Sequence, residues 1–216
     1  MNYFGHAVLA SERTKDCRFV LGAMLPDLAS ILHTACPTSR EPMLGDGLAF
    51  HHATDAVFHQ TATFIELNHD AVHILRALGL RRGPARAVAH IGTEMLLDAN
   101  LCRHEGHRET YQEALRYAAG SRLDLAWVSA ELSQAFTGLA THLLDRGEAA
   151  HSATPERLSF RLARALEGRA RLALGEDELP LVAHFGELFA PRVADVAESL
   201  LGEVRDGLVA RAALRP

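Results

Sequence analysis

Two short stretches of the chain each place three residues with metal-binding side chains at positions i, i+4 and i+8. Residues four apart lie on one face of an α-helix, about one turn from each other, so each triple predicts a narrow stripe along a helix. Two such helices packed face to face would enclose imidazoles and carboxylates, an arrangement in which helical proteins commonly hold metal ions. The stripes consist of His51, Asp55 and His59, and of His90, Glu94 and Asp98.

The second stripe lies on a segment that is apolar on almost every side. Val88, Leu96 and Ala99 fall on the face opposite the stripe, and a helix that is apolar all round is typically central in its fold. Carboxylates on such a helix would be at least partly buried, which is costly unless a counter-charge lies near them. We therefore expect metal ions or arginines beside Glu94 and Asp98. The alternative is that one stripe is a solvated face and the other a buried network of ion pairs.

The sequence predicts an all-α protein. Ala, Leu, Arg and Glu are abundant, β-branched residues are sparse, and no stretch alternates regularly between apolar and polar residues. We predict one all-α domain over residues 1–216, a multi-helix bundle with a metal-site half (1–107) and a helical C-terminal half (108–216). Pro26 should kink the second helix and turn Asp27 towards a specific partner. The predicted helices cover residues 2–12, 16–33, 47–64, 66–79, 84–102, 108–119, 122–147, 155–174 and 179–213.

The composition excludes several classes of protein. With 48% hydrophobic residues, the chain has the composition of a globular protein and not of a disordered one. Its net charge of −5 leaves no basic footprint for nucleic acid. No apolar run is long enough to span a membrane, and the start lacks the features of a signal peptide, so we expect a cytoplasmic protein. The three cysteines form no CxxC motif, which argues against a thiolate zinc site.

Four motifs follow one another within residues 1–105: MNYFGH, LGAMLPD, GLAFHHATD and EMLLDAN. In kind and order they resemble the motifs of the acyl carrier protein phosphodiesterase family. The resemblance implies a fold like that of the HD-type metal phosphohydrolases, and manganese-dependent release of phosphopantetheine from acyl carrier protein. The chain departs from the family pattern at His59 (acidic in the family), Glu94 (Asp) and Ala99 (His). The matching residues are His6, Gly22, Asp27, Gly47, His51, Asp55, Glu94 and Asp98.

A second, weaker resemblance points to the zinc-dependent phospholipase C family. It consists of an early His, an upstream Asp in a G-x3-PD context, an H-x3-D motif and an H-x3-E motif, but the N-terminal Trp of that family is missing. Both resemblances imply phosphoester hydrolysis at a helical site with more than one metal ion. The second one implies as ligands His6, Asp27, His51, Asp55, His90 and Glu94.

We predict a metal-dependent phosphoester hydrolase, in particular a phosphodiesterase, whose substrate could be held by a carrier protein. Two ions of Mn, Fe or Zn would lie about 3.5–4 Å apart, bridged by Asp55 or Asp27, and a metal-bound hydroxide would attack the phosphorus. His59 or His90 would protonate the leaving oxygen, because imidazole titrates near neutral pH. The predicted ligands are His6, Asp27, His51, Asp55, His90, Glu94 and Asp98, and the predicted catalytic residues are His59, His90 and Asp55.

Other readings of the same residues stay open. Arg82 and Arg86 could bind the outer phosphate charges, although a solvated helix start would carry the same residues. The doublet His69-Asp70 is a weak HD-type signal. A di-iron oxidase is an alternative function, since carboxylate and His cages on helices also hold iron, although the Glu-x-x-His spacing of ferritin-like sites is missing. The other alternative is a non-catalytic helical metal-binding or structural protein.

Overall fold

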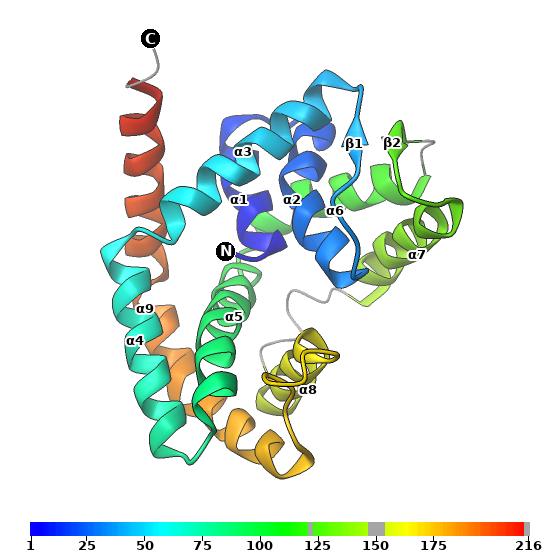
Figure 1. Ribbon diagram of the computed structural model, residues 1–216. Helices are drawn as coiled ribbons and strands as arrows, with labels where there is room; N and C mark the ends of the chain where they lie inside the picture. The colour runs from blue at the N-terminus through cyan, green and yellow to red at the C-terminus, as the bar shows by residue number, and fades with distance from the viewer. Residues whose placement is uncertain (121–122, 147–153, 214–216) are drawn as a thin grey trace. The chain divides into compact units, whose positions relative to one another are not determined.

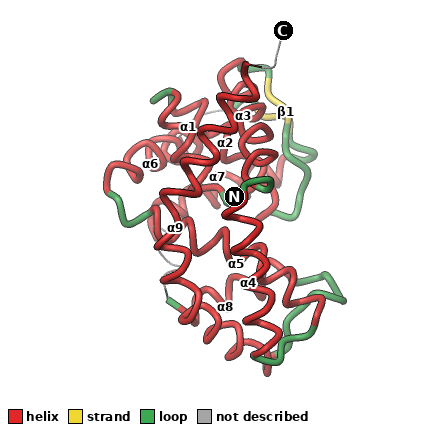
Figure 2. Tube along the Cα trace, turned by 90° about the vertical axis from the view of Figure 1, so that its left-hand side faces the viewer, coloured by secondary structure: helices red, strands yellow, loops and turns green. Residues whose placement is uncertain are grey.

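The computed structural model describes residues 1–120, 123–146 and 154–213, and most of these residues are helical (Figure 1, Figure 2). The all-α prediction is therefore confirmed at the level of fold class. None of the described helices combines the length and the apolar character that a membrane crossing requires. The helices are α1 (Tyr3–Arg13), α2 (Cys17–Ile31), α3 (Pro42–Phe58), α4 (Ala62–Ala77), α5 (Arg82–Leu101), α6 (Glu105–Gly120), α7 (Ala130–Arg146), α8 (Pro155–Leu166) and α9 (Leu179–Ala213).

The chain divides into two compact units, and each unit combines two separate stretches of sequence. Unit 1 comprises Met1–Ala56 and Leu101–Ala149, and unit 2 comprises Val57–Asn100 and Ala150–Pro216. Each unit thus draws on both of the halves that we distinguish in the sequence. That 1–216 forms a single domain stays a prediction.

Unit 1 is built around α1, α2 and α6, which contact one another, and α6 also contacts α7. Helix α1 is the most deeply buried of them, because its residues from Tyr3 to Ser11 are all buried. Tyr111 of α6 stacks on Tyr3 and meets Phe4 edge-on. Two residues of β1 (Thr38–Ser39) pair antiparallel with β2 (Leu125–Ala126). A polar side chain on the inner face of α1 is therefore held in the core of this unit.

Helices α2 and α3 touch through their backbones at two glycines. A Cβ atom on Gly22 would overlap the carbonyl oxygen of Leu44, and one on Gly47 would overlap the carbonyl oxygen of Phe19. Both obstacles are backbone atoms, so they cannot move aside as a flexible side chain would. The close approach fixes the register of α3 against α2, and His51 follows one helical turn after Gly47.

Unit 2 is organised around the long helix α9, on which α8 and α4 pack (Figure 1). Gly92 of α5 faces Phe185 of α9 and Leu162 of α8, at the distances of ordinary van der Waals contact. The 3-10 helix η2 (Glu176–Glu178) precedes α9, and Arg81 reaches Glu178 with Nε and Nη2, each at 2.8 Å. This bidentate ion pair connects the start of α5 to the start of α9.

Several predicted helix boundaries are wrong, and one of these errors concerns the first stripe. The helix predicted at 47–64 begins at Pro42 and ends at Phe58, so His59 lies in a turn. The hydroxyl of Thr61 donates to the carbonyl of Phe58 and accepts a hydrogen bond from the backbone N–H of Phe64, as an N-cap of α4. Helix α2 runs through Pro26 to Ile31.

In the C-terminal half two more boundaries differ. The helix predicted at 122–147 starts only at Ala130, because residues before it form β2 and a turn; residues 122 and 147 lie outside the described chain. The helix predicted at 155–174 ends at Leu166.

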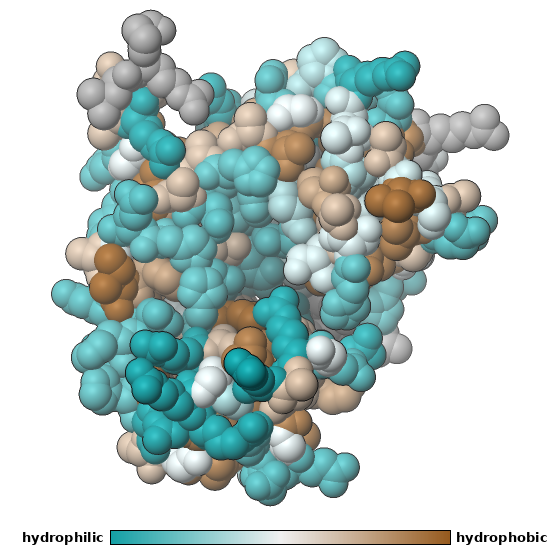
Figure 3. Space-filling view, viewed as in Figure 1, coloured by the Kyte–Doolittle hydropathy of each residue, from teal (hydrophilic) through white to brown (hydrophobic). Residues whose placement is uncertain are grey.

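The face of the protein in Figure 3 is mostly hydrophilic, with apolar residues scattered over it. Exposed large apolar side chains in the described chain come from several elements, for example Ile31, Phe160 and Val209. Clusters of polar side chains are therefore the better place to look for a function.

Candidate metal sites

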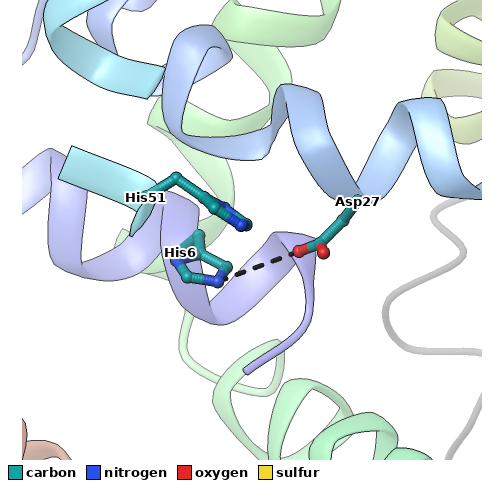
Figure 4. Close-up of side chains that lie close together, drawn as sticks. All are labelled: His6, Asp27 and His51. Carbon is teal, nitrogen blue, oxygen red and sulfur yellow. Dashed lines mark ion pairs between the residues drawn. The ribbon is translucent and has the colours of Figure 1, made fainter. Parts of the chain in front are cut away.

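Three of the predicted ligands come together in unit 1. His6 of α1, Asp27 of α2 and His51 of α3 point towards one another (Figure 4), and one ligand atom from each lies within 4.8 Å of the other two. We call these residues the buried cluster, since His6 is 0% and His51 6% exposed. Nitrogen and oxygen ligands bind Zn²⁺ at about 2.0–2.2 Å, so ligand atoms on one ion lie about 3–4 Å apart. Small side-chain movements would let the buried cluster hold an ion.

The protonation of His6 follows from its partner Thr54. The Nδ1 atom of His6 lies 2.9 Å from Thr54 Oγ1, while that hydroxyl donates its one hydrogen to a backbone carbonyl, of Phe50 or of His51, at 3.0 or 2.8 Å. The hydroxyl oxygen must therefore accept from Nδ1–H. The neutral ring then carries its lone pair on Nε2, a buried atom with no hydrogen-bond partner among the described residues. Nε2 faces a carboxylate oxygen of Asp27 at 3.9 Å.

His51 is oriented in the same way. Its Nδ1 atom lies 2.9 Å from the carbonyl oxygen of Ala23, which can only accept, so Nδ1 carries the hydrogen. The lone pair of the neutral ring is again on Nε2. Its ring lies 4.0 Å from the ring of His6, centroid to centroid. Fixing one ring nitrogen by a hydrogen bond so that the other can ligate is the usual support of a metal-binding histidine.

The electrostatics of the buried cluster favour neutral imidazoles. Burial, followed by the neighbouring His51, holds the pKa of His6 well below 6.5. Burial lowers the pKa of His51 to about 4, although the bond to Ala23 and the charge of Asp55 oppose the shift. Both rings are thus ready to ligate at neutral pH. Burial, with the charge of Asp27, raises the pKa of Cys36 to about 11, so this thiol stays protonated and is a poor ligand.

A fourth predicted ligand borders the buried cluster. Oδ1 of Asp55 lies 3.9 Å from His6 Nε2, and the side chain of Asp55 is 39% exposed. The ammonium group of Met1 lies 3.3 Å from the same oxygen. Asp55 therefore connects the cluster to solvent. Asp55 thus lies beside the three residues of the buried cluster; that all four bind a metal ion stays a prediction.

A second group of possible ligands lies in unit 2, and we call it the half-buried cluster. It consists of His59, His90 and Glu94, with one ligand atom of each within 4.8 Å of the others. Oε1 of Glu94 lies 3.3 Å from His90 Nε2 and 3.7 Å from His59 Nε2. The two imidazoles stack with 4.8 Å between their centroids. The exposed fractions of the side chains are 30% for His59, 44% for His90 and 13% for Glu94.

The remaining predicted site residues lie outside both clusters. Asp98 is buried, at 2% exposure, one turn beyond Glu94 on α5. Arg82 and Arg86 are exposed on α5, and their contact with a phosphate stays a prediction. The single cage of seven ligands would join residues of both units and also stays a prediction. The prediction that His51, Asp55 and His59 form one stripe along a helix is wrong. His59 follows the end of α3 and lies with His90 and Glu94 instead.

The HD doublet, His69-Asp70, lies on α4. Asp70 forms an ion pair with Arg192 of α9, and His69 faces His73 one turn on, with 3.2 Å between their Nε2 atoms. Neither residue belongs to a candidate metal group in the described chain. Asp70 therefore links α4 to α9, whereas the His69 side chain is 71% exposed.

The groups that orient these histidines could not be predicted from the sequence pattern. Thr54 has no metal-binding side chain, and its role depends on a contact between α3 and α1 that spacing does not show. The contribution of Ala23 is a backbone carbonyl, which any residue would supply. The available signals are Gly22 and Gly47, since a glycine inside a helix can indicate a close backbone approach.

Compared with protein-family models, with curated proteins and with solved structures, the chain matches none. Any indication of function therefore comes from the side chains themselves.

Proposed function

We propose that this protein is a metal-dependent phosphoester hydrolase and that the buried cluster holds its ion. The observation that carries the proposal is the arrangement of two neutral imidazoles, each with Nδ1 engaged and Nε2 available, beside the carboxylate of Asp27. Such a site has three protein ligands and leaves positions for water and substrate, as catalytic metal sites do.

The residues fit a divalent ion of the Mn, Fe or Zn type. A lone pair of His6 Nε2 buried opposite a carboxylate oxygen 3.9 Å away leaves room for a cation between them. Mixed nitrogen and oxygen ligands suit these metals better than Ca²⁺. An ion bound there would lower the pKa of a water molecule and neutralise charge on the phosphoryl oxygens.

The chain's own residues divide the remaining work. His6 and His51 stay neutral and fixed, so that they ligate without adding charge. Asp27 supplies the negative charge that balances the ion. Asp55, at the exposed side of the cluster, is placed to orient an attacking water and accept its proton. The predicted roles of His59 and His90 as proton donors would join the two units and are not needed for this proposal.

Three sequence motifs bear on the substrate class. The motifs MNYFGH, LGAMLPD and GLAFHHATD contain the residues of the buried cluster and resemble those of acyl carrier protein phosphodiesterases. Holo acyl carrier protein is therefore the natural candidate to test beside generic phosphoesters. The HD-like fold implied by the same resemblance is part of the proposal as well.

The test is hydrolysis of bis-p-nitrophenyl phosphate and of holo acyl carrier protein by the chain loaded with Mn²⁺ or Zn²⁺. Asp27→Asn and His51→Ala should each lower the rate at least about 100-fold, since the ion loses a ligand. His184→Ala is the control, because His184 is exposed and pairs with Glu187. Metal-loaded protein that hydrolyses no phosphomonoester or phosphodiester would overturn the proposal and leave a non-catalytic metal-binding protein.

A second candidate, an iron-dependent oxidase or oxygenase, is favoured by one observation. The buried cluster offers two histidines and one carboxylate, the ligand set of many non-haem Fe(II) oxygenases. Elemental analysis of protein purified without chelator separates the two functions. Iron with oxygen consumption would support the oxygenase, and zinc or manganese with phosphoester hydrolysis would support the hydrolase.

A further inference from the structure

The half-buried cluster has the geometry of a metal site in its own right. In a tetrahedral site with bonds of about 2.0–2.1 Å, ligand atoms lie about 3.3–3.5 Å apart. The distance from Glu94 Oε1 to His90 Nε2, 3.3 Å, falls in this range, and the distance to His59 Nε2, 3.7 Å, is slightly longer. The three groups are therefore spaced as ligands around a common centre.

Aromatic side chains hold the two imidazoles in this arrangement. Phe64 meets the ring of His59 edge-on at 5.0 Å and the ring of His90 at 5.4 Å, centroid to centroid. Phe58 meets His59 at 5.2 Å and Phe64 at 4.4 Å. Both phenylalanines are buried, at 0% and 3% exposure. Packing thus limits the ring rotamers before any ion arrives, which reduces the entropy cost of binding.

The backbone around His59 is fixed as well. The Thr61 hydroxyl bonds to the carbonyl of Phe58 at 2.7 Å, and the N–H of Phe64 bonds to Thr61 at 3.3 Å. This N-cap determines where α3 ends and α4 begins, and so places His59 in the turn between them. His90 and Glu94 lie one turn apart on α5. An ion at this point would connect the turn to α5.

We propose that His59, His90 and Glu94 bind one divalent transition ion of the zinc type, independently of the buried cluster. Three protein ligands leave one coordination position for water, and the partial exposure of His90 gives the ion a path to solvent. The ion is exchangeable and fastens the turn between α3 and α4 onto α5. Two imidazoles favour Zn²⁺, Co²⁺ and Ni²⁺ and disfavour Mg²⁺ and Ca²⁺. This site does not depend on the proposed hydrolase activity.

Calorimetric titration of chelator-treated protein with Zn²⁺ alone tests the proposal. The background is the double variant His69→Ala/His73→Ala, because that exposed pair on α4 could itself bind Zn²⁺. We expect His59→Ala and Glu94→Gln each to weaken one binding event at least about 100-fold, as loss of a ligand should exceed the 10–100-fold effect of losing its support. His184→Ala should leave the titration unchanged. Binding that is the same with and without His59 and Glu94 would overturn the proposal.

Two further measurements distinguish binding at this site from binding at the buried cluster and from misfolding of a variant. Asp27→Asn should abolish the binding event of the buried cluster and leave this one intact. Zn²⁺ should slow amide hydrogen exchange at residues 59–61 in the background protein and not in its Glu94→Gln derivative, because only a bound ion holds the turn. Equal exchange with and without Zn²⁺ in the background protein would contradict the proposed link between the turn and α5.

Discussion

The two clusters use similar side chains but are supported in different ways. In the buried cluster, hydrogen bonds from Nδ1 to Thr54 and to the Ala23 carbonyl orient His6 and His51. In the half-buried cluster, edge-on contacts with Phe64 orient the imidazoles. Hydrogen bonds fix the tautomer as well as the direction, whereas apolar packing limits the rotamer alone. We therefore expect the proposed site in unit 1 to bind its ion more tightly and to exchange it more slowly than the proposed site in unit 2.

The largest effect that separates the two units should come from their glycines. Gly47→Ala places a Cβ against the carbonyl oxygen of Phe19 and forces α3 away from α2, so we expect a loss of about 3 kcal/mol in the free energy of unfolding. Gly92→Ala in unit 2 places its Cβ 3.5 Å from Phe185, an ordinary contact, and should cost little. Urea unfolding measures both.

Gly45→Ala is the matched control on the same helix. No atom lies within 4 Å of its added Cβ, so the substitution should stabilise α3 by up to about 1 kcal/mol through helix propensity. If Gly47→Ala behaves like Gly45→Ala, the close approach of α2 and α3 does not position the buried cluster.

The next effect concerns the pH dependence of the free energy of unfolding, to which the buried cluster should contribute. The pKa of His51 is about 4 in the folded chain and about 6.5 in the unfolded chain, so below about pH 6.5 the unfolded state binds more protons. The stability due to neutral His51 is present above that pH and is lost as the pH falls towards 4, by up to about 3 kcal/mol. His6 acts in the same direction. Urea unfolding of chelator-treated protein across this range should show the loss, and His51→Gln should flatten it; an equal slope in the variant would refute the assignment.

A smaller effect tests the hydrogen-bond support of His6. Thr54→Val keeps the shape and removes the acceptor for Nδ1–H, so affinity at the buried cluster should fall about 10–100-fold. Thr93→Val is the control, because Thr93 is equally buried and its hydroxyl bonds to the carbonyl of Ala89 and to no imidazole. Zn²⁺ titration should show the half-buried cluster unaffected by the Thr54 change. Weakening of both clusters alike would mean a general loss of stability.

Much of the architecture is predictable from local sequence. Helical periodicity and composition indicate the class and most of the helices, because these depend on residues close together in the chain. The grouping of His6, Asp27 and His51 follows from the order of the motifs and the two glycines that bring α2 onto α3. A spacing pattern can predict the wrong position for a residue when a local signal, such as a helix cap, ends the helix within that pattern.

His59 illustrates that limit. The spacing i+8 from His51 predicts one continuous helix, but the capping hydroxyl of Thr61 ends it at Phe58 and directs His59 to α5. The predicted start of the next helix, residue 66, is wrong for the same reason, because the N-cap at Thr61 starts α4 at Ala62. Tertiary supports such as Thr54 depend on contacts between residues far apart in sequence, and no spacing rule reveals them.

The most direct test of the central claim is anomalous diffraction from crystals of the chain grown with Zn²⁺. We expect a peak bounded by His6 Nε2, His51 Nε2 and a carboxylate oxygen of Asp27, at about 2.0–2.2 Å from each, and a second peak among His59, His90 and Glu94. A map with zinc bound elsewhere and no peak between His6, Asp27 and His51 would contradict the claim that this cluster is a metal site.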